Sequence, residues 1–319
     1  MSTDSLPRPP RIVFMGTPAF AVASLAALVD AGYHVVGVIT APDKPAGRGM
    51  KMHESAVKQY AVAQGLTVLQ PEKLKNPAFL EELAALKADL QVVVAFRMLP
   101  ELVWNMPPMG TINVHASLLP QYRGAAPINW AIINGEQQTG VTTFKLQHAI
   151  DTGNILMQAP LAIAPRETAG ELHDRLMKLG AEVLVKTIAG MLNGTLHDQP
   201  QPADMGQLKH APKLTTATGD INWHQSAQQI VQLVRGLSPF PGAFTSLHGK
   251  MLKLYQCHAA PKPAHDSHAP GTVLTDGKTM LGMVAADAVV YFETLQLEGK
   301  KRMEVTDFLR GYRAPQAST

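Results

Sequence analysis

Apolar residues along the first 150 positions of the chain follow two alternating patterns. Arg11–Met15 and His34–Thr40 are short, mainly apolar runs that predict buried strands, whereas Ala19–Ala31 between them repeats apolar residues at helical spacing. A strand, a helix and a second strand in so short a stretch predict a βαβ unit with parallel strands. Leu90–Phe96 is almost continuously apolar, as is typical of a central parallel strand covered on both faces.

The same patterns predict the rest of an α/β unit. Gly, Pro, Lys and Arg are concentrated in Ala41–Met52, which predicts a long loop. A Rossmann-like domain with a parallel central sheet is therefore expected for the N-terminal part of the chain. Its further helices are expected at Glu54–Gln64, Pro77–Ala88, Ala125–Asn134 and Arg166–Leu192, and its further strands at Thr111–His115 and Val141–Leu146.

The pattern changes near residue 198. From there to residue 218, Pro, Gln, Thr and Gly dominate and no period holds, which predicts a linker. Beyond it, one helix at Ser226–Leu237 and closely spaced strands with Gly turns predict a small OB-like β-barrel. The expected parts are an N-terminal domain at 1–198, a linker at 199–218 and a C-terminal domain at 219–319. The barrel strands are expected at Ala243–Leu247, Met251–Gln256, Gly271–Leu274, Thr279–Val284 and Ala288–Leu297.

Composition and charge exclude several classes of protein. With 46% hydrophobic and 17% charged residues among 319, the chain can build a sizeable core and is not disordered. One cysteine, Cys257, cannot form an internal disulfide, and we expect it to be a small buried hydrophobe. The N-terminus lacks the pattern of a secretory signal and no apolar run would span a bilayer, so we expect a cytoplasmic protein.

The net charge of +3 is unevenly distributed. Residues 1–200 hold 16 Lys/Arg and 16 Asp/Glu, whereas residues 201–319 hold 12 and 9, so the excess lies in the C-terminal part. A bias this weak does not by itself imply nucleic-acid binding.

The turn after the first strand does not read as a dinucleotide site. Only Gly16 of a Gly-x-Gly-x-x-Gly fingerprint is present, and Pro18 stands where a phosphate-binding amide would be needed. A nicotinamide oxidoreductase is therefore disfavoured, and Gly16 is expected to serve a tight turn and close packing.

Candidate chemistry lies in the stretch Gly110–Ile128. Asn113 and His115 are two apart in an expected strand, so both side chains project to one face near its carboxyl end, where α/β sheets place ligands. Further along the chain, Asp151 begins an Asp-Thr-Gly turn. An amide, an imidazole and a carboxylate suit transfer through a tetrahedral intermediate, since they can stabilise an oxyanion, move protons and fix the imidazole.

Each of these residues also has a plainer explanation. A histidine at a strand end is usually a polar residue with satisfied hydrogen bonds, and Asp-Thr-Gly is common at turns. The same three groups would suit a hydrolase, and spacing does not show that Asp151 meets His115.

The combination Asn-x-His-x-Ser-Leu-Leu-Pro-x-x-x-Gly, followed further on by Asp-Thr-Gly, resembles the signature of the folate-dependent formyltransferases. The resemblance implies that Asn113, His115 and Asp151 form the catalytic set. It also implies a formyltransferase domain that binds 10-formyltetrahydrofolate as formyl donor. The implied folate-binding residues are Ser117, Leu118, Leu119 and Pro120 in one loop and Phe96, Arg97 and Met98 in the wall Val94–Leu99.

Features far from this signature concern the molecule that accepts the formyl group. The opening Arg11–Val22, the Ala-Gly-Arg-Gly loop and the segments Ala211–Leu214, Gly219–Trp223 and Val234–Ala243 resemble the members of that family that formylate methionyl initiator tRNA. The resemblance makes Arg48 the first candidate for tRNA contact. Lys44, Lys51 and Lys213 are the further candidates. Without the resemblance, Arg48, Lys44 and Lys51 would be interpreted as solvated surface residues.

The sequence also departs from the family pattern. The usual Ala-Tyr-Gly-x-Ile-Leu-Pro reads Ala-Phe-Arg-Met-Leu-Pro here, so it is one residue shorter, with Phe96 for tyrosine and Arg97 for glycine. The backbone path of the folate wall is expected to differ, and the role of Arg97 is open. His148 has no role carried over from the family.

The reaction implied by the resemblance is formyl transfer from 10-formyltetrahydrofolate to the amino group of methionine esterified to initiator tRNA, by a monomer in the cytoplasm. The attacking group is an amine of the substrate, and no Cys/His metal spacing is visible, so we expect no metal. Formylation of a nucleotide sugar or of glycinamide ribonucleotide, hydrolysis of formyl-folate and a non-catalytic RNA-binding role are the alternatives.

Overall fold

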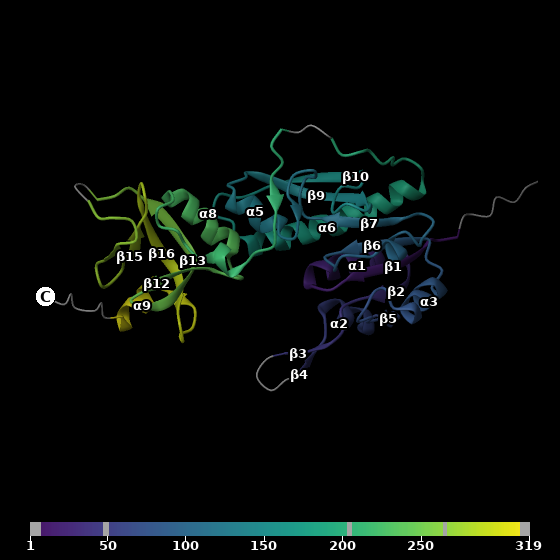
Figure 1. Ribbon diagram of the computed structural model, residues 1–319, viewed down its shortest axis with the longest axis horizontal. Helices are drawn as coiled ribbons and strands as arrows, with labels where there is room; N and C mark the ends of the chain where they lie inside the picture. Colours follow the sequence, from purple (N-terminus) through teal and green to yellow (C-terminus); the bar gives the residue numbers. More distant parts are fainter. Residues whose placement is uncertain (1–7, 47–50, 203–205, 264–266, 313–319) are drawn as a thin grey trace, which may run out of the picture. The chain divides into compact units, whose positions relative to one another are not determined.

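The structure is a computed structural model and describes residues 8–46, 51–202, 206–263 and 267–312 (Figure 1). The described residues divide into two compact units built from interleaved stretches of the chain. Unit 1 comprises 1–123, 140–161 and 174–209, and unit 2 comprises 124–139, 162–173 and 210–319. The domain boundaries expected from the sequence stay a prediction.

The centre of unit 1 is a mostly parallel sheet. Within the described residues its strand order is β10-β9-β7-β6-β1-β2-β5. Parallel pairs join β1 to β2 and to β6, β2 to β5 and β6 to β7, whereas β9 runs antiparallel to β7. The strands are β1 (Arg11–Gly16), β2 (His34–Ile39), β5 (Val68–Leu69), β6 (Leu90–Val94), β7 (Thr111–His115), β9 (Gln138–Lys145) and β10 (Ile155–Ala162).

The order of these strands creates a topological switch point. From β1 the chain leaves to one side for β2 and β5 and then returns on the other side for β6 and β7. Ligands of open α/β sheets bind where the carboxyl ends of the strands diverge in this way. The carboxyl ends of β1 and β6, with β7 next to β6, are therefore the part of the sheet at which a site is expected.

Helices cover both faces of this sheet (Figure 1). Side chains of β1, β2 and β6 form a buried cluster with Phe79 and Leu83 of α3 and Val103 of α4. Local signals start some of the helices, because the side chain of Ser55 caps α2 and that of Asn76 caps α3. The helices that contribute to this unit are α1 (Ala19–Asp30), α2 (Ala56–Ala63), α3 (Pro77–Ala85), α4 (Glu101–Trp104) and α6 (Ala169–Leu192), of which 174–192 belong here.

The stretch Ala41–Met52 is more ordered than the loop predicted for it. Its two ends form a short antiparallel pair, β3 (Lys44–Ala46) and β4 (Lys51–His53), with Lys44 opposite His53. The long loop predicted for this stretch therefore contains two short strands near its ends.

Unit 2 is built around an antiparallel sheet. Its described strands follow the order β12-β13-β16-β15-β14, and β17 pairs with β16. The register of β13 against β16 shifts around Gln256, where a bulge bends the strand. These strands are β12 (Ala243–Leu247), β13 (Lys250–Ala260), β14 (Val273–Thr275), β15 (Leu281–Val284), β16 (Val289–Leu297) and β17 (Met303–Glu304).

One face of α8 (Ala227–Leu237) supplies the core of unit 2. Ile230, Val234 and Leu237 are fully buried in a cluster with side chains of the sheet, at the spacing of one helical face. A capping box between Ser226 and Gln229 starts this helix. The remaining elements are β8 (Arg123–Gly124), α5 (Pro127–Ile133), β11 (His210–Ala211), α7 (Thr216–Gly219) and α9 (Val305–Gly311). The fold class predicted from the sequence is confirmed.

The described helices include none that has both the length and the apolar character needed to cross a membrane.

At the turn after β1, a Cβ on Gly16 would lie 2.6 Å from the Cβ of Ala21 and 3.0 Å from the carbonyl oxygen of Val94. The packing role expected for Gly16 is thereby confirmed.

Cys257 lies on β13 inside the core of unit 2, as predicted. Burial raises the pKa of its thiol to about 12, so the reactive thiolate is scarce at neutral pH. We predict that Cys257 in the folded protein does not react with a thiol reagent at pH 8. One thiol per chain should become titratable after unfolding in guanidinium. Fast labelling of the folded protein would show that the side chain is accessible.

Candidate active site

Two of the candidate residues stand on one face of β7. A Cβ on Gly180 of α6 would lie 3.2 Å from the Cγ1 of Val114, so Val114 faces that helix. Because side chains alternate along a strand, Asn113 and His115 face away from α6. In the register of the sheet, Asn113 lies beside Val93 of parallel β6 and opposite Phe144 of antiparallel β9.

The ring of His115 is fixed by a backbone carbonyl. Its Nε2 lies 2.9 Å from the carbonyl oxygen of Tyr122, and the side chain is buried. A carbonyl oxygen only accepts hydrogen bonds, so Nε2 carries the proton and donates it. Nδ1 of the neutral ring therefore holds the free lone pair. Nothing in the motif indicated Tyr122 as a partner, because its backbone makes the contact.

The structure brings Asp151 to His115. Oδ2 of Asp151 lies 3.9 Å from Nδ1 of His115, and the two side chains are only 12% and 8% exposed. This distance exceeds that of a hydrogen bond, but catalytic contacts are often long until the substrate is bound. The imidazole thus lies between a carbonyl that fixes one nitrogen and a carboxylate that faces the other.

The turn that carries Asp151 has an unusual backbone. Asp151 has a φ of +54°, in the left-handed region, which Asp tolerates better than most residues. Two positions on, a Cβ on Gly153 would lie 1.6 Å from the carbonyl oxygen of Lys145. Only glycine fits so close to the end of β9, so the Asp-Thr-Gly sequence sets the path of this turn.

The side-chain amide of Asn113 has no hydrogen-bond partner within the described residues. Its side chain is half-buried at the carboxyl half of β7. A half-buried amide in this state has donors available for a ligand, because buried polar groups in proteins are otherwise paired.

The backbone of the loop after β7 is held by a side chain of β9. Ser117, Leu119 and Pro120 are buried, and Leu118 packs over Gly140 of β9. From beneath, the hydroxyl of Thr142 donates to the carbonyl of Ser117 (2.7 Å) and accepts from the amide of Leu119 (3.0 Å). These four predicted folate-binding residues therefore form a frame that Thr142 of β9 holds in place.

The segment after β6, which is the expected folate wall, begins with an unusual backbone conformation. Ala95 has a φ of +47°, and the next residue, Phe96, packs against the cluster of α3 and α4. The guanidinium of Arg97 donates to the carbonyl oxygens of Glu72 (2.9 Å) and Pro71 and lies over the ring of Phe96. Its Nε is buried without a partner in the described part of the chain, and burial lowers the pKa of this side chain.

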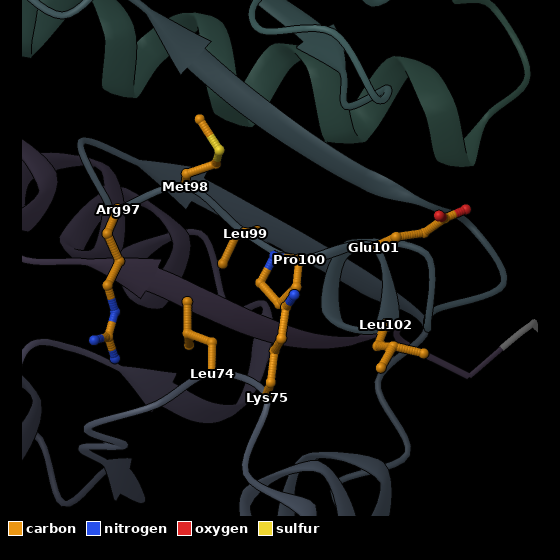
Figure 2. A pocket seen from close by; sticks show the side chains of 8 residues that line it. All are labelled: Leu74, Lys75, Arg97, Met98, Leu99, Pro100, Glu101 and Leu102. Carbon is orange, nitrogen blue, oxygen red and sulfur yellow. The ribbon is translucent and has the colours of Figure 1, made fainter.

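A cavity of about 500 Å³ opens beside this wall. Figure 2 shows Leu74 and Lys75 on one side of it and Leu99 and Pro100 on the other. Its lining is mainly apolar with a few charged groups, as in sites for small molecules. Of the predicted folate-binding residues, Arg97 and Met98 line this cavity, and Met98 is 74% exposed.

His148 lies on the loop that leads to Asp151. Its Nε2 is 3.3 Å from Oε1 of Glu101, and its ring stands edge-on to that of Trp104 at 5.4 Å. The loop between β9 and Asp151 is thereby in contact with α4.

The predicted tRNA-binding residues are spread over both units. Lys44 is exposed on β3, Lys51 is on β4, and Lys213 is exposed in unit 2, whereas Arg48 lies outside the described residues. The base of the hairpin is fixed by Lys58, which forms ion pairs with Asp43 and with Glu54 (2.9 Å). Hydrogen bonds from Lys58 and Gln70 lower the pKa of Asp43, and those to Asp43 and Glu54 raise the pKa of Lys58.

The residues that the structure describes contain no group of three or more His, Cys, Asp or Glu side chains placed to hold a metal ion. The expectation that the reaction uses no metal stays a prediction.

An imidazole, a carboxylate and an amide thus lie at the carboxyl edge of an α/β sheet, in a chain that also has a β-rich unit, and these groups suit transfer through a tetrahedral intermediate. The family model for formyl transferase matches residues 10–188, and the model for the formyl transferase C-terminal domain matches residues 213–313. The chain is 55% identical over 310 residues to a methionyl-tRNA formyltransferase of Parabacteroides distasonis, covering 95% of this chain and 96% of the relative. The chain belongs to the methionyl-tRNA formyltransferase family.

Solved structures share the fold at low sequence identity. An N-formyltransferase from Helicobacter canadensis, solved with folinic acid and dTDP-3-aminofucose, has a TM-score of 0.66 at 19% identity, covering 89% of this chain and 98% of that one. HypX from Aquifex aeolicus, solved with tetrahydrofolic acid, has a TM-score of 0.63 at 17% identity, covering 94% of this chain. The present chain spans about half, 47%, of HypX.

The position of Thr142 generates a prediction about the loop frame. Thr142→Val keeps the shape of the side chain but leaves the amide of Leu119 and the carbonyl of Ser117 without this partner. We expect the free energy of unfolding to fall by about 1–3 kcal/mol. The KM for the folate substrate should rise in the same variant, because the loop frame loosens.

Thr143→Val is the matched control. Thr143 bonds Thr187 of α6 at 2.7 Å on the opposite face of β9. Urea denaturation should show a loss of stability in both variants, whereas only Thr142→Val should change the folate KM. Equal folate KM values in the two variants would contradict a role for Thr142 in the folate loop.

Proposed function

We propose that the chain transfers the formyl group of 10-formyltetrahydrofolate to the amino group of methionyl initiator tRNA, and that Asn113, His115 and Asp151 carry this chemistry. The observation that supports it most is that the largely buried side chains of His115 and Asp151 face each other, while the amide of Asn113 on the same face of β7 has no partner among the described residues. The family of the chain supplies the reaction, and the site supplies groups suited to each of its steps.

The reaction needs charge stabilisation and proton transfer. The free amine of methionine attacks the formyl carbon, a C–N bond forms, and the bond from that carbon to N10 breaks. Asn113 donates a hydrogen bond to the oxygen on which negative charge develops, and His115 adds to its stabilisation once Nδ1 is protonated. The proton that the amine loses is delivered to N10 of the departing tetrahydrofolate with the help of His115.

The fixed tautomer of His115 assigns its two nitrogens. Nε2–H is engaged by the carbonyl of Tyr122, so Nδ1 is the nitrogen that exchanges a proton with the reactants. Asp151 faces Nδ1 and stabilises the imidazolium that forms when Nδ1 is protonated. Because the nucleophile is the substrate amine, no nucleophilic side chain takes part.

The folate substrate fits the wall and loop around this site. The mainly apolar lining near Leu99 suits a flat ring, and the loop Ser117–Pro120 directly follows the strand that carries Asn113 and His115. Exclusion of water from the formyl carbon by these apolar side chains limits hydrolysis of the donor.

The acceptor is assigned from residues outside the catalytic set. Lys44 of β3, Lys51 of β4, Arg48 between them in the sequence and Lys213 in unit 2 contact the phosphates or grooves of the tRNA. Formylated initiator tRNA serves translation initiation, so the proposal places the enzyme in the cytoplasm. We infer that it acts there as a monomer.

The proposal predicts that Asn113 acts on the chemical step. In Asn113→Ala, single-turnover formylation of methionyl-tRNA should slow by about 10²- to 10³-fold, because one donor to the developing oxyanion is lost. Folate binding, measured by equilibrium titration, should change little. The rate of single-turnover formylation should fall in the same way in His115→Ala.

Asn193→Ala is the control, since Asn193 is exposed beyond the end of α6 and its side chain bonds only Thr195 within the described residues. It should match the wild type in rate and in stability. Turnover by Asn113→Ala at the wild-type rate would reject the assignment of this residue.

A second prediction concerns Arg48. Arg48→Ala should raise the KM for methionyl-tRNA without changing folate binding. The slope of log affinity against log salt should become shallower by about 1, because one phosphate contact is removed. Lys178→Ala removes the same charge from an exposed position on α6 and serves as control. Equal salt slopes for both variants and the wild type would argue against tRNA contact by Arg48.

A further inference from the structure

Residues that the sequence assigned to a linker lie against the catalytic loops of unit 1. We call the described residues 199–202 and 206–209 the strap. At one end, Gln199 and Ile155 exchange two backbone hydrogen bonds of 2.7 and 2.8 Å. At the other end, the amide of Lys209 donates to Oε1 of Gln121 (2.9 Å), and the carbonyl of Lys209 accepts from the amide of Tyr122 (2.7 Å).

Gln201 of the strap holds the turn of Asp151. Its Nε2 donates to the carbonyl oxygens of Asp151 and Gly153, both at 2.8 Å. Its Oε1 accepts from Nε (3.1 Å) and Nη2 (2.5 Å) of Arg123. A primary amide has two hydrogens on one nitrogen, so it can bind two carbonyls at once, which a hydroxyl cannot do.

The orientation of this amide is fixed by charge. The guanidinium of Arg123 only donates, so it selects the oxygen of Gln201 and leaves the nitrogen facing the Asp-Thr-Gly turn. Hydrogen bonds from a charged donor are stronger than neutral ones. Arg123 therefore holds Gln201 in the orientation in which both of its hydrogens reach the turn.

The turn needs such support. A non-glycine residue with positive φ costs free energy, on the order of 1 kcal/mol or more, and persists only where its surroundings determine it. Asp151 at φ +54° is such a residue. The carbonyl of Asp151 is bound by Gln201 while its carboxylate faces His115, so Gln201 holds the backbone from which the carboxylate extends.

The strap also reaches the other side of the imidazole. Tyr122 has a φ of +59°, its amide donates to Lys209, and its carbonyl accepts from His115. Both partners of the His115 ring are thus bound by the strap, one at Gln201 and the other at Lys209.

We propose that Gln201, oriented by Arg123, is a positioning residue for formyl transfer that acts through Asp151. This inference rests on the proposed function, because it concerns the same reaction. Gln201 touches no reacting atom. Its amide holds the backbone of Asp151 so that the carboxylate meets Nδ1 of His115 when that nitrogen becomes protonated. Both polar atoms of the Gln201 side chain are bonded to residues of unit 1, so neither is left to contact the tRNA that accepts the formyl group.

Three variants of the full-length chain test the inference. Gln201→Ala removes the bridge, and Gln201→Glu keeps an acceptor for Arg123 but replaces the donor to the turn by an oxygen. We expect both to lower kcat for methionyl-tRNA by about 10- to 100-fold, with little change in either KM, because catalytic geometry is lost while the binding surfaces remain. Gln199→Ala is the matched control, because Gln199 is exposed and pairs with Ile155 through its backbone.

A double-mutant cycle separates positioning from general support. In the Asp151→Ala background, measured by single turnover, Gln201→Ala should cause no further loss, since residues that act as a unit are not additive. Thermal unfolding is followed for each variant, and the rates are taken well below its midpoint. An equal loss from Gln201→Ala in both backgrounds, or a wild-type kcat for Gln201→Ala, would overturn the inference.

The wild-type chain is assayed beside the variants. Formylation of methionyl-tRNA by the wild type supports the proposed function whatever the variants do. Absence of that activity in the wild type would overturn the proposed function and this inference with it.

Discussion

The hydrogen bond from Nε2 of His115 to the carbonyl of Tyr122 governs the chemistry available at the carboxyl edge of the sheet. It fixes the tautomer and the plane of the ring in a buried place, so that Nδ1 alone remains to exchange protons. A side-chain partner could rotate or titrate, whereas a backbone carbonyl can do neither. The cost is that Tyr122 must keep a left-handed backbone, at φ +59°.

Strained backbone recurs around the site for a common reason. Ala95, Tyr122 and Asp151, which follow or face the ends of the strands, all have positive φ. The turns at Tyr122 and Asp151 bring a carbonyl and a carboxylate to the two ring nitrogens of His115, and the backbone of each is bound by a residue of the strap. The two loops next to His115 are bound by polar side chains of β9 and the strap, so the fold supplies the free energy that these conformations cost.

The sequence predicted those parts of the fold that depend on local periodicity. The apolar runs of β1, β2 and β6 predicted their strands, and the two-residue period placed Asn113 and His115 on one face. β10 gave no clear strand signal, because Leu156 is its one buried residue and Pro160 interrupts it. The contacts of Gln201 could not be predicted either, since hydrogen bonds between segments so far apart in sequence leave no local pattern.

Arg97 shows how a departure from a family pattern can be compensated. A loop shortened by one residue after β6 has less freedom to reach α4, and Ala95 takes a left-handed conformation where the chain leaves the strand. The guanidinium of Arg97 then binds the carbonyls of Pro71 and Glu72, which ties the shortened wall to the segment before α3. Glycine could not make these contacts. The arginine that looked anomalous in the sequence is therefore part of what holds the cavity wall in position, and the shorter loop and the longer side chain are best understood as one change.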